Sequence, residues 1–279
     1  MDTFPVFIGF DSREANEFQV AKKSLISRSS VPLHVQGLYR EALEWPGDDS
    51  GIYTRTWIRG DRDQWVDVID GKPFSTEFSF SRFCVPILLQ YRGWALFHDS
   101  DMVWQADIVE LLKLRDDKYA VMVVKHQHKP TETVKMDGRE QTAYPRKNWS
   151  SFVLWNCEHP SNRQLTRTTV NVEPGSWLHG FKWLKDSEIG ELPPEWNFLV
   201  GVNQVDPDGE KPKVLHFTLG TPEMDGYEDC QFSDIYWWEK HRPSNEYTYS
   251  TEASFDHTTD ERRGVLKRLA SAPGSEWDE

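Results

Sequence analysis

The sequence predicts an α/β fold, a single Rossmann-like domain with a mostly parallel central sheet flanked by helices. Short apolar runs typical of buried strands recur along the chain, and segments with helical spacing of apolar residues lie between them. Strands that alternate with helices favour parallel pairing, with helices on both faces of the sheet. The 279 residues, 38% of them hydrophobic, suit one large domain or two small ones.

The N-terminal segment has the pattern of a strand, a turn and a helix. Residues 4–10 read FPVFIGF, a short apolar run, and a helical pattern that includes Leu25 follows it. Asp11 or Ser12 is placed to cap this helix. A second strand is expected over residues 31–38.

The rest of the chain continues this alternation. Residues 40–75 are polar and rich in Gly, Asp and Trp, so we expect irregular structure there. Residues 78–91 have helical spacing, and Pro86 is early enough to be tolerated near a first turn. Further strands are expected over 93–97, 119–124, 152–155 and 213–217.

A change of composition predicts a domain boundary near the C-terminus. From about Pro243 onward, Ser, Thr, Glu and Asp dominate the sequence. We therefore expect one domain over residues 1–242 and a tail over 243–279, partly disordered or helical, with one short helix near 259–270.

The bulk composition excludes some classes of protein. A formal charge of −13 counts against a broad surface that tracks nucleic-acid phosphates. The three cysteines, Cys84, Cys157 and Cys230, match neither a disulfide framework nor a zinc cluster, so a cytoplasmic location is expected. No signal peptide or membrane-spanning stretch is evident in the sequence.

The most informative motif is Asp99-Ser100-Asp101. It follows a buried apolar strand directly, and ligands of parallel sheets bind beyond the carboxyl ends of the strands. Two carboxylates at this spacing can reach one hard cation, although acids at this spacing more often form a helix cap or a turn. The same spacing at 61–63 and 206–208 lies in polar loops.

His216 is the first candidate for a third metal ligand. It lies in the apolar run VLHF, just before a turn that contains Gly220 and Pro222. A histidine in such a strand is more often a core residue, and His126 and His128 compete for the role of ligand.

The order of these features resembles retaining glycosyltransferases of the GT-A fold. The resemblance is nearest to the glycogenin and bacterial galactosyltransferase group, and closer still to uncharacterised phage and bacterial glycosyltransferases. It covers about residues 4–240 and depends mainly on the Asp-x-Asp motif and the late HFTLGTP segment, residues 216–222.

The resemblance implies roles for several residues of the donor site. Asp99, Asp101 and His216 would bind Mn²⁺ or Mg²⁺, and an imidazole ligand favours Mn²⁺. The other donor-binding residues would be Gly9, Phe10 and Asp11 at the nucleoside, Arg82 beside the nucleotide and the metal-site acids, Ser100, and Gly220 at the diphosphate.

Two segments resemble the family's sugar-binding stretches less closely. Residues 148–156 resemble an Asn-Ala-Gly stretch beneath the donor sugar, with Ser151 where Gly is usual. Asp186-Ser187-Glu188 resembles an Asp-Gln-Asp stretch, so Asp186, with Glu188 in reserve, is expected nearest the reacting sugar. Trp196-Asn197 matches a following Trp-Asn pair. The family's diphosphate-binding lysine is absent, and its charge would come from Lys125, Arg146, Lys147 or the metal alone.

The resemblance implies a hexosyltransferase that uses a UDP-linked sugar and retains the anomeric configuration. The metal would stabilise the leaving phosphate as a Lewis acid. The acceptor is either a hydroxymethylated pyrimidine in phage-type DNA or a saccharide or protein. A DNA acceptor would need base flipping and a confined basic groove, for which the basic stretches 125–129 and 139–147 are candidates.

Two rival functions remain open from the sequence. A metal-dependent phosphohydrolase would also use Asp-x-Asp, but it usually needs further acids at nearby strand ends. A non-catalytic glycan-binding module would explain the aromatic residues, which include 13 Trp, but not a metal pair with a histidine.

Overall fold

The computed structural model describes residues 3–43, 51–60, 64–127 and 146–243. Apart from Pro243, the predicted C-terminal tail lies outside these ranges, as do its short helix near 259–270 and His128. None of the described helices is long and apolar enough to cross a membrane.

A six-stranded mixed sheet forms the centre of the molecule, in the order β10-β8-β9-β6-β1-β2. Neighbouring strands pair in parallel except at β9, which is antiparallel to both β6 and β8. The predicted α/β fold with a mostly parallel sheet is therefore confirmed. The strands are β1 (Phe4–Gly9), β2 (Leu33–Leu38), β6 (Trp94–His98), β8 (Val121–Val123), β9 (Phe152–Asn156) and β10 (Ile189–Glu191).

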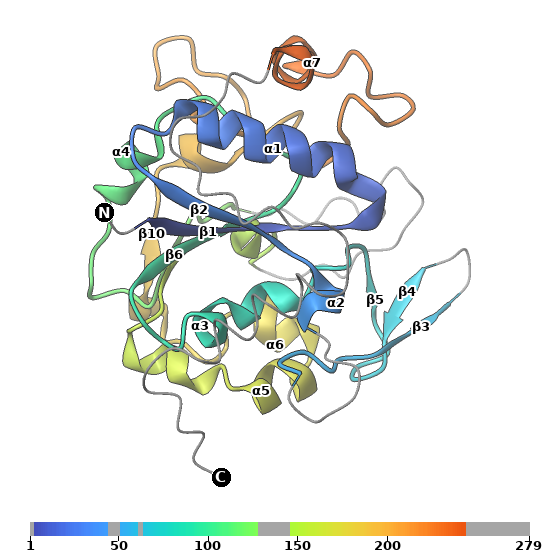
Figure 1. The fold of residues 1–279 in the computed structure, drawn as a ribbon, viewed down its shortest axis with the longest axis vertical. Helices are drawn as coiled ribbons and strands as arrows, with labels where there is room; N and C mark the ends of the chain where they lie inside the picture. Colours follow the sequence, from blue (N-terminus) through green and yellow to red (C-terminus); the bar gives the residue numbers. More distant parts are fainter. Residues whose placement is uncertain (1–2, 44–50, 61–63, 128–145, 244–279) are drawn as a thin grey trace.

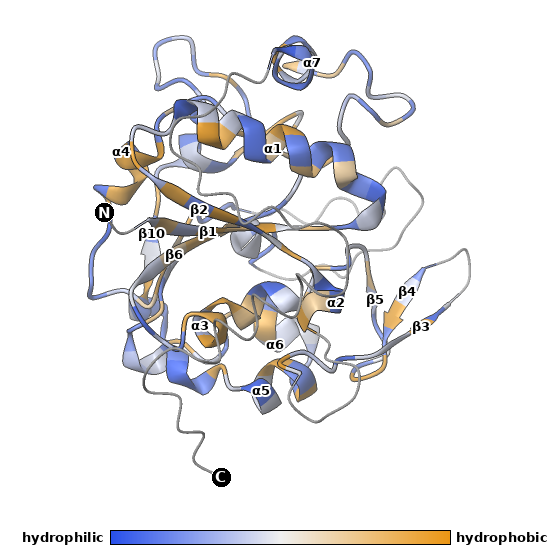
Figure 2. Cartoon of the chain, in the orientation of Figure 1, coloured by the Kyte–Doolittle hydropathy of each residue, from blue (hydrophilic) through white to orange (hydrophobic). Residues whose placement is uncertain are grey.

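Helices cover both faces of this sheet. Figure 1 shows α1 (Ala15–Arg28) on one face and α3 (Val85–Leu88), α5 (Arg167–Val172) and α6 (Gly175–His179) on the other. Apolar residues gather on α3 and parts of the central strands, whereas hydrophilic and apolar residues alternate along α1, as Figure 2 shows; α7 (Ser233–His241) lies beyond α1 (Figure 1). Buried apolar residues of the sheet therefore form one core cluster with α1 and another with α3, α5 and α6.

The predicted cap at Asp11 is present, but it caps the 3-10 turn that precedes α1, and α1 itself begins after Glu14 without a side-chain cap. The Asp11 carboxylate accepts a hydrogen bond of 2.9 Å from the backbone N–H of Arg13, and a 3-10 turn, Ser12–Glu14, leads into the helix. A short polar side chain at this position satisfies a backbone donor that the helix itself leaves unpaired.

The prediction of irregular structure over residues 40–75 was wrong for the described part of that segment. It contains α2 (Arg40–Leu43) and a three-stranded antiparallel sheet of β3 (Trp57–Arg59), β4 (Trp65–Asp67) and β5 (Pro73–Phe74). The rings of Trp57, Trp65 and Phe74 pack together, with centroids 5.7–6.3 Å apart. Aromatic packing across strands stabilises a sheet that the polar composition concealed.

The helix predicted over residues 78–91 is shorter than expected. A 3-10 turn, Ser81–Cys84, leads directly into α3, which ends at Leu88. Gln90 and Tyr91 have positive φ angles of 52° and 55°, which reverse the chain before β6. Residues with positive φ cannot continue a right-handed helix.

A second three-stranded sheet brings the late part of the chain against the Asp-x-Asp loop. Its central strand β12 (Val214–His216) pairs antiparallel with β7 (Met102–Trp104) and parallel with β11 (Phe198–Leu199). The register sets His216 opposite Met102. Neither β7 nor β11 was predicted. The remaining helical elements are α4 (Ile108–Leu112) and the 3-10 turns Trp149–Ser151, Pro160–Gln164, Asp186–Glu188 and Pro194–Asn197.

Candidate functional site

The Asp-x-Asp loop is held at both ends by backbone hydrogen bonds to distant segments. Strand β6 ends at His98, and the Asp99 N–H donates to the Ser151 carbonyl at 2.9 Å. The Phe217 N–H donates to the Asp101 carbonyl, also at 2.9 Å. The loop therefore lies at the carboxyl end of β6, where the sequence placed it, between the main sheet and the second sheet.

Asp99, Asp101 and His216 form one cluster of ligand atoms. One atom from each of the three residues lies within 4.8 Å of the other two. The Nε2 atom of His216 is 3.3 Å from Oδ1 of Asp101. The pairing of β12 with β7 produces this contact, because it places His216 beside the residue that follows Asp101.

A chain of hydrogen bonds determines the tautomer of His216. The Ser151 hydroxyl donates to the Asn148 carbonyl at 2.6 Å, so its oxygen accepts from Nδ2 of Asn197 at 3.0 Å. The Asn197 amide oxygen then faces Nδ1 of His216 at 2.8 Å, which makes Nδ1 the protonated nitrogen of the neutral ring. A neutral His216 therefore directs the bare Nε2 toward the Asp101 carboxylate.

The donor set fits a divalent cation. Two electron-rich atoms that face each other, the His216 nitrogen and the Asp101 oxygen, repel unless a positive charge lies between them. Carboxylate oxygens with one imidazole suit Mn²⁺, and Mg²⁺ accepts the oxygens readily. Histidine ligands are commonly oriented by a hydrogen bond from the other ring nitrogen, and Asn197 supplies that bond here.

We expect Asn197→Ala to weaken Mn²⁺ binding by about 10- to 100-fold, because the His216 ring would lose the partner that fixes its tautomer and orientation. Titration calorimetry with Mn²⁺ in the presence of UDP measures this effect. Asn203→Ala is the matched control, since the Asn203 amide oxygen also accepts a hydrogen bond, from the Leu199 N–H at 2.7 Å, but lies outside the cluster. Equal Mn²⁺ affinities in the two variants would contradict the role of Asn197.

Arg82 connects the cluster to the main sheet. Its Nη1 atom donates to Oδ1 of Asp99 at 2.8 Å and to the Ser150 carbonyl at 2.9 Å. The guanidinium lies 5.1 Å from the Phe78 ring centroid and 5.0 Å from that of Phe97. Arg82 thus holds one acid of the cluster in place, and the family resemblance implied such a contact.

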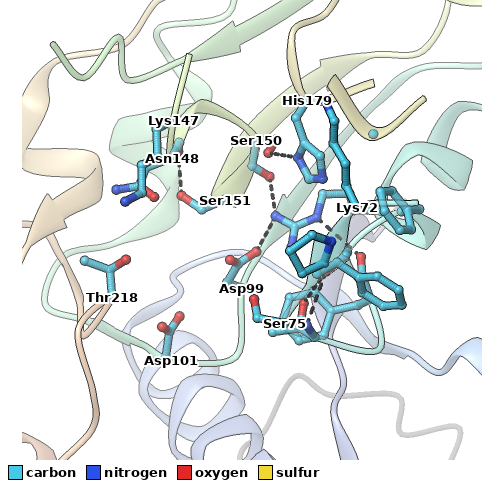
Figure 3. Close-up of a pocket in the computed structure, with 18 of the residues that line it drawn as sticks. Lys72, Ser75, Asp99, Asp101, Lys147, Asn148, Ser150, Ser151, His179 and Thr218 are labelled. Atoms are coloured by element: carbon cyan, nitrogen blue, oxygen red, sulfur yellow. Dashed lines mark hydrogen bonds and ion pairs between the residues drawn. The ribbon is translucent and has the colours of Figure 1, made fainter. Parts of the chain in front are cut away.

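A cavity opens beside this cluster. Figure 3 shows Asp99 and Asp101 on one side of it, with Ser150 and His179 above and Lys72 opposite. Lining side chains come from the β4–β5 region, from the turn before β9, from α6, and from the segment after β12. They include Glu14, Asp70, Lys72, Ser75, Thr76, Arg82, Asp99, Asp101, Lys147, Asn148, Ser150, Ser151, Ser176, His179, His216 and Thr218.

The three residues predicted at the nucleoside do not line this cavity. The fully buried Asp11 accepts hydrogen bonds from Arg13 and from the Glu77 N–H. Phe10 packs on Phe18, with ring centroids 5.4 Å apart. A Cβ atom at Gly9 would lie 2.5 Å from the Phe78 ring, so the absence of a side chain there allows that ring to pack. Contact of these residues with a nucleoside remains a prediction.

Two other predicted donor-site residues have protein partners close by. The Ser100 hydroxyl donates to the Glu14 carboxylate at 2.7 Å, and Glu14 itself lines the cavity. A Cβ atom at Gly220 would lie 2.8 Å from the Tyr227 ring. The close approach that Gly220 permits in this structure is therefore to Tyr227, and contact with a diphosphate remains a prediction.

The two predicted catalytic acids lie outside the cavity lining. The Asp186 side chain is 89% exposed and pairs with Arg146. Glu188 accepts hydrogen bonds of 2.8 Å from the Lys185 N–H and from the Ser161 hydroxyl, and the Lys185 bond lowers the pKa of Glu188. Both acids belong to the 3-10 turn before β10, and neither is part of the cluster of ligand atoms.

The residues that were expected to supply positive charge to the diphosphate differ in their positions relative to the cavity. Lys147 lines the cavity, whereas Arg146 is occupied by Asp186 and by the Gly180 carbonyl. The Lys125 ammonium lies 5.9 Å from the Trp149 ring centroid. Burial lowers the pKa of His126 to about 4, so it is neutral, but it does not belong to the cluster of ligand atoms.

Sequence reasoning missed several residues around the cavity. Lys72 lies in the segment expected to be irregular, and no pattern singled out His179. Asn197 was noted only as part of a Trp-Asn match. The signal that could have found it is its position just before a short strand that pairs with the strand of His216.

Comparison with known proteins gives one close relative in sequence and several in structure. The chain is 46% identical to Protein CDI of Arabidopsis thaliana over 236 residues, which is 84% of each protein. No protein-family model matches the chain.

Solved glycosyltransferase structures share the fold at low sequence identity. The bifunctional glycosyltransferase WbbM matches with a TM-score of 0.56 and 16% identity over 95% of this chain. The glycosyltransferase GlyE of Streptococcus pneumoniae matches with 0.54 and 16% over 97%. The galactosyltransferase LgtC, solved with donor and acceptor sugar analogues, matches with 0.50 and 13% over 94%. This chain spans 51%, 66% and 100% of those three chains, respectively. The fold is therefore GT-A.

Proposed function

The chain belongs to the same family as Protein CDI of Arabidopsis thaliana and has the GT-A fold, and on this premise we propose that it is a metal-dependent glycosyltransferase. The observation that carries the proposal is the Asp99–Asp101–His216 cluster at the edge of a cavity lined by polar side chains. In a glycosyltransferase this cluster would hold the cation that binds the diphosphate of a nucleotide-sugar.

The residues around the cluster support this chemistry. Asp99 and Asp101 supply negative charge that recruits a cation, and Asn197 directs the His216 nitrogen toward it. The cation, when bound, stabilises the charge that develops on the leaving phosphate oxygen. Arg82 keeps Asp99 in position, and Lys147 adds a positive charge at the cavity wall.

The finer features of the reaction belong to the same proposal. We propose a UDP-linked hexose as donor, Mn²⁺ as the preferred ion, and retention of the anomeric configuration. A front-face reaction, in which the leaving phosphate accepts the acceptor proton, needs no strong protein base, and the exposed Asp186 side chain does not supply one at the cavity.

The function is tested by incubating the protein with a panel of nucleotide-sugars and Mn²⁺. We expect slow release of nucleoside diphosphate and free sugar in the absence of an acceptor, and loss of this release on adding EDTA. A phosphohydrolase would instead release inorganic phosphate. A glycan-binding module would bind sugars without any turnover, and that result would refute the proposed activity.

The acceptor is proposed to be a saccharide or glycoconjugate. The cavity wall carries short polar side chains, such as Ser75, Thr76 and Ser176, beside the rings of Phe74 and Phe80, a combination that suits a sugar ring. The alternative is a hydroxymethylated pyrimidine in DNA. A mass-spectrometric screen of oligosaccharides and hydroxymethylated DNA separates them, because a hexose mass shift on the DNA nucleoside would replace the saccharide proposal.

A further inference from the structure

A hydroxyl and an imidazole form a pair on the cavity wall beside Asp99. The Oγ atom of Ser150 and the Nδ1 atom of His179 lie 2.7 Å apart, and both residues line the cavity (Figure 3). Ser150 lies in the 3-10 turn before β9, and His179 is the last residue of α6. The pair therefore depends on packing between two segments that are 29 residues apart.

The environment of His179 keeps its imidazole ring neutral. Burial, and then the nearby cations of Arg82 and Arg55, lower the pKa of His179 well below its ordinary value. A neutral imidazole has one bare nitrogen, and in the tautomer with Nδ1 bare the Ser150 hydroxyl donates its proton to that nitrogen. The lone pairs of Ser150 Oγ are then the part of the hydroxyl that remains for a ligand.

The location of Ser150 ties the pair to the metal cluster. A single nitrogen, Nη1 of Arg82, donates both to the Ser150 carbonyl at 2.9 Å and to the Asp99 carboxylate at 2.8 Å. The next residue, Ser151, begins the chain of hydrogen bonds that reaches His216 through Asn197. A diphosphate held at the cluster would therefore bring its sugar into the part of the cavity that Ser150 borders.

The reacting carbon of that sugar needs an electron-rich group close to it. Positive charge develops on it as its bond to the phosphate oxygen breaks and the electron pair leaves with that oxygen. Ser187 stands where the family resemblance leads one to expect a glutamine, and it lies in a 3-10 turn beside the exposed Asp186. Several hydrogen-bonded hydroxyls line the cavity, and that of Ser150, held by His179, belongs to the residue whose carbonyl shares the Arg82 guanidinium with Asp99.

We propose that the Ser150 hydroxyl, held by His179, contacts the transferred sugar at its reacting carbon. This inference rests on the proposed glycosyltransferase function. Ser150 Oγ acts through its lone pairs, which stabilise the developing positive charge, and no covalent bond to the serine forms. His179 is a positioning residue, because it acts on the sugar only through Ser150.

The first test is the steady-state kinetics of Ser150→Ala with the best nucleotide-sugar. We expect kcat to fall about 100-fold, the size of effect seen when one oriented polar group is removed from a transition state. The donor KM and the Mn²⁺-dependent affinity for UDP should stay within about twofold, because neither the cluster nor Arg82 loses a side-chain contact.

Further variants separate this role from a structural one. Ser150→Thr keeps the hydroxyl and should recover most of kcat. His179→Asn keeps an acceptor near the Nδ1 position and should be milder than His179→Leu, which removes it. Ser29→Ala is the matched control, because its hydroxyl donates to the Val31 carbonyl at 2.7 Å, away from the cavity, and its loss should leave kcat unchanged.

Each outcome decides the proposal. An unchanged kcat in Ser150→Ala overturns it, and so does a parallel loss of UDP affinity, which would assign the pair to support of the metal site. If Ser150→Ala does not fold, as judged by circular dichroism, equal kcat values for His179→Asn and His179→Leu overturn it. A wild-type protein that binds Mn²⁺ and UDP but turns over no nucleotide-sugar refutes the proposed function, and this inference falls with it.

Discussion

Asp101→Ala should abolish Mn²⁺-dependent binding of UDP and lower nucleotide-sugar turnover by about 1,000-fold or more. The physical reason is that Asp101 faces the bare nitrogen of His216 at 3.3 Å, so its removal leaves two of the three ligands of the cluster. A bound metal contributes several kcal/mol to stabilisation of the leaving phosphate, and each 1.36 kcal/mol is about tenfold in rate. Titration calorimetry with UDP, with and without Mn²⁺, and release of UDP from the donor measure the two effects.

The chain contains a matched control for this experiment. Asp206-Pro207-Asp208 has the same spacing of acids, but both acids are exposed and the Asp206 carboxylate accepts a hydrogen bond from the Asp208 N–H. Asp208→Ala should therefore leave both measurements unchanged. Turnover at the wild-type rate in a folded Asp101→Ala protein would refute the metal site.

Asp67→Ala should lower the free energy of unfolding by about 3–5 kcal/mol, because it leaves the Arg55 charge buried without its counterion. Both side chains are 1% exposed, and the guanidinium forms a two-pronged contact with Asp67, in which Nε lies 3.0 Å from Oδ1. Arg55 also donates to the Val170 and Glu173 carbonyls at 3.1 and 2.7 Å. Urea denaturation followed by circular dichroism measures the change.

The Arg55–Asp67 ion pair also supports the wall of the cavity. It fastens β4 to α5, and the chain continues from β4 into the cavity wall at Asp70 and Lys72. A loosened wall should raise the donor or acceptor KM of Asp67→Ala at temperatures where it remains folded.

An exposed ion pair provides the control for Asp67→Ala. Asp116 pairs with Lys118 at 2.7 Å, with side chains 41% and 62% exposed. Solvent screens such pairs, so Asp116→Ala should leave the urea midpoint unchanged. A midpoint for Asp67→Ala equal to that of the wild type would show that the buried pair contributes nothing to stability.

Local sequence patterns determined the parts of this protein that depend on neighbouring residues. The apolar run before His98 and the acids after it predicted a strand that ends in a loop with two carboxylates that could share a cation; the strand is present, and both acids belong to one cluster of possible ligand atoms. The capping role of Asp11 also follows from a few adjacent residues. Burial of apolar side chains and satisfaction of backbone donors act over such short segments, so composition and spacing reveal them.

Only the tertiary structure decided how distant side chains come together at the site. The antiparallel register of β7 and β12 brings His216 to Asp101 across 115 residues of sequence, and Asn197 then fixes the ring. The pairing of Ser150 with His179 and the exposure of Asp186 likewise depend on how loops and short helices pack. Such contacts join segments that are distant in the sequence and share no local pattern. The acids of the cluster could therefore be predicted from their spacing after a strand, and Arg82 and His216 from the family resemblance, whereas the roles of Asn197 and His179 became visible only in the folded chain.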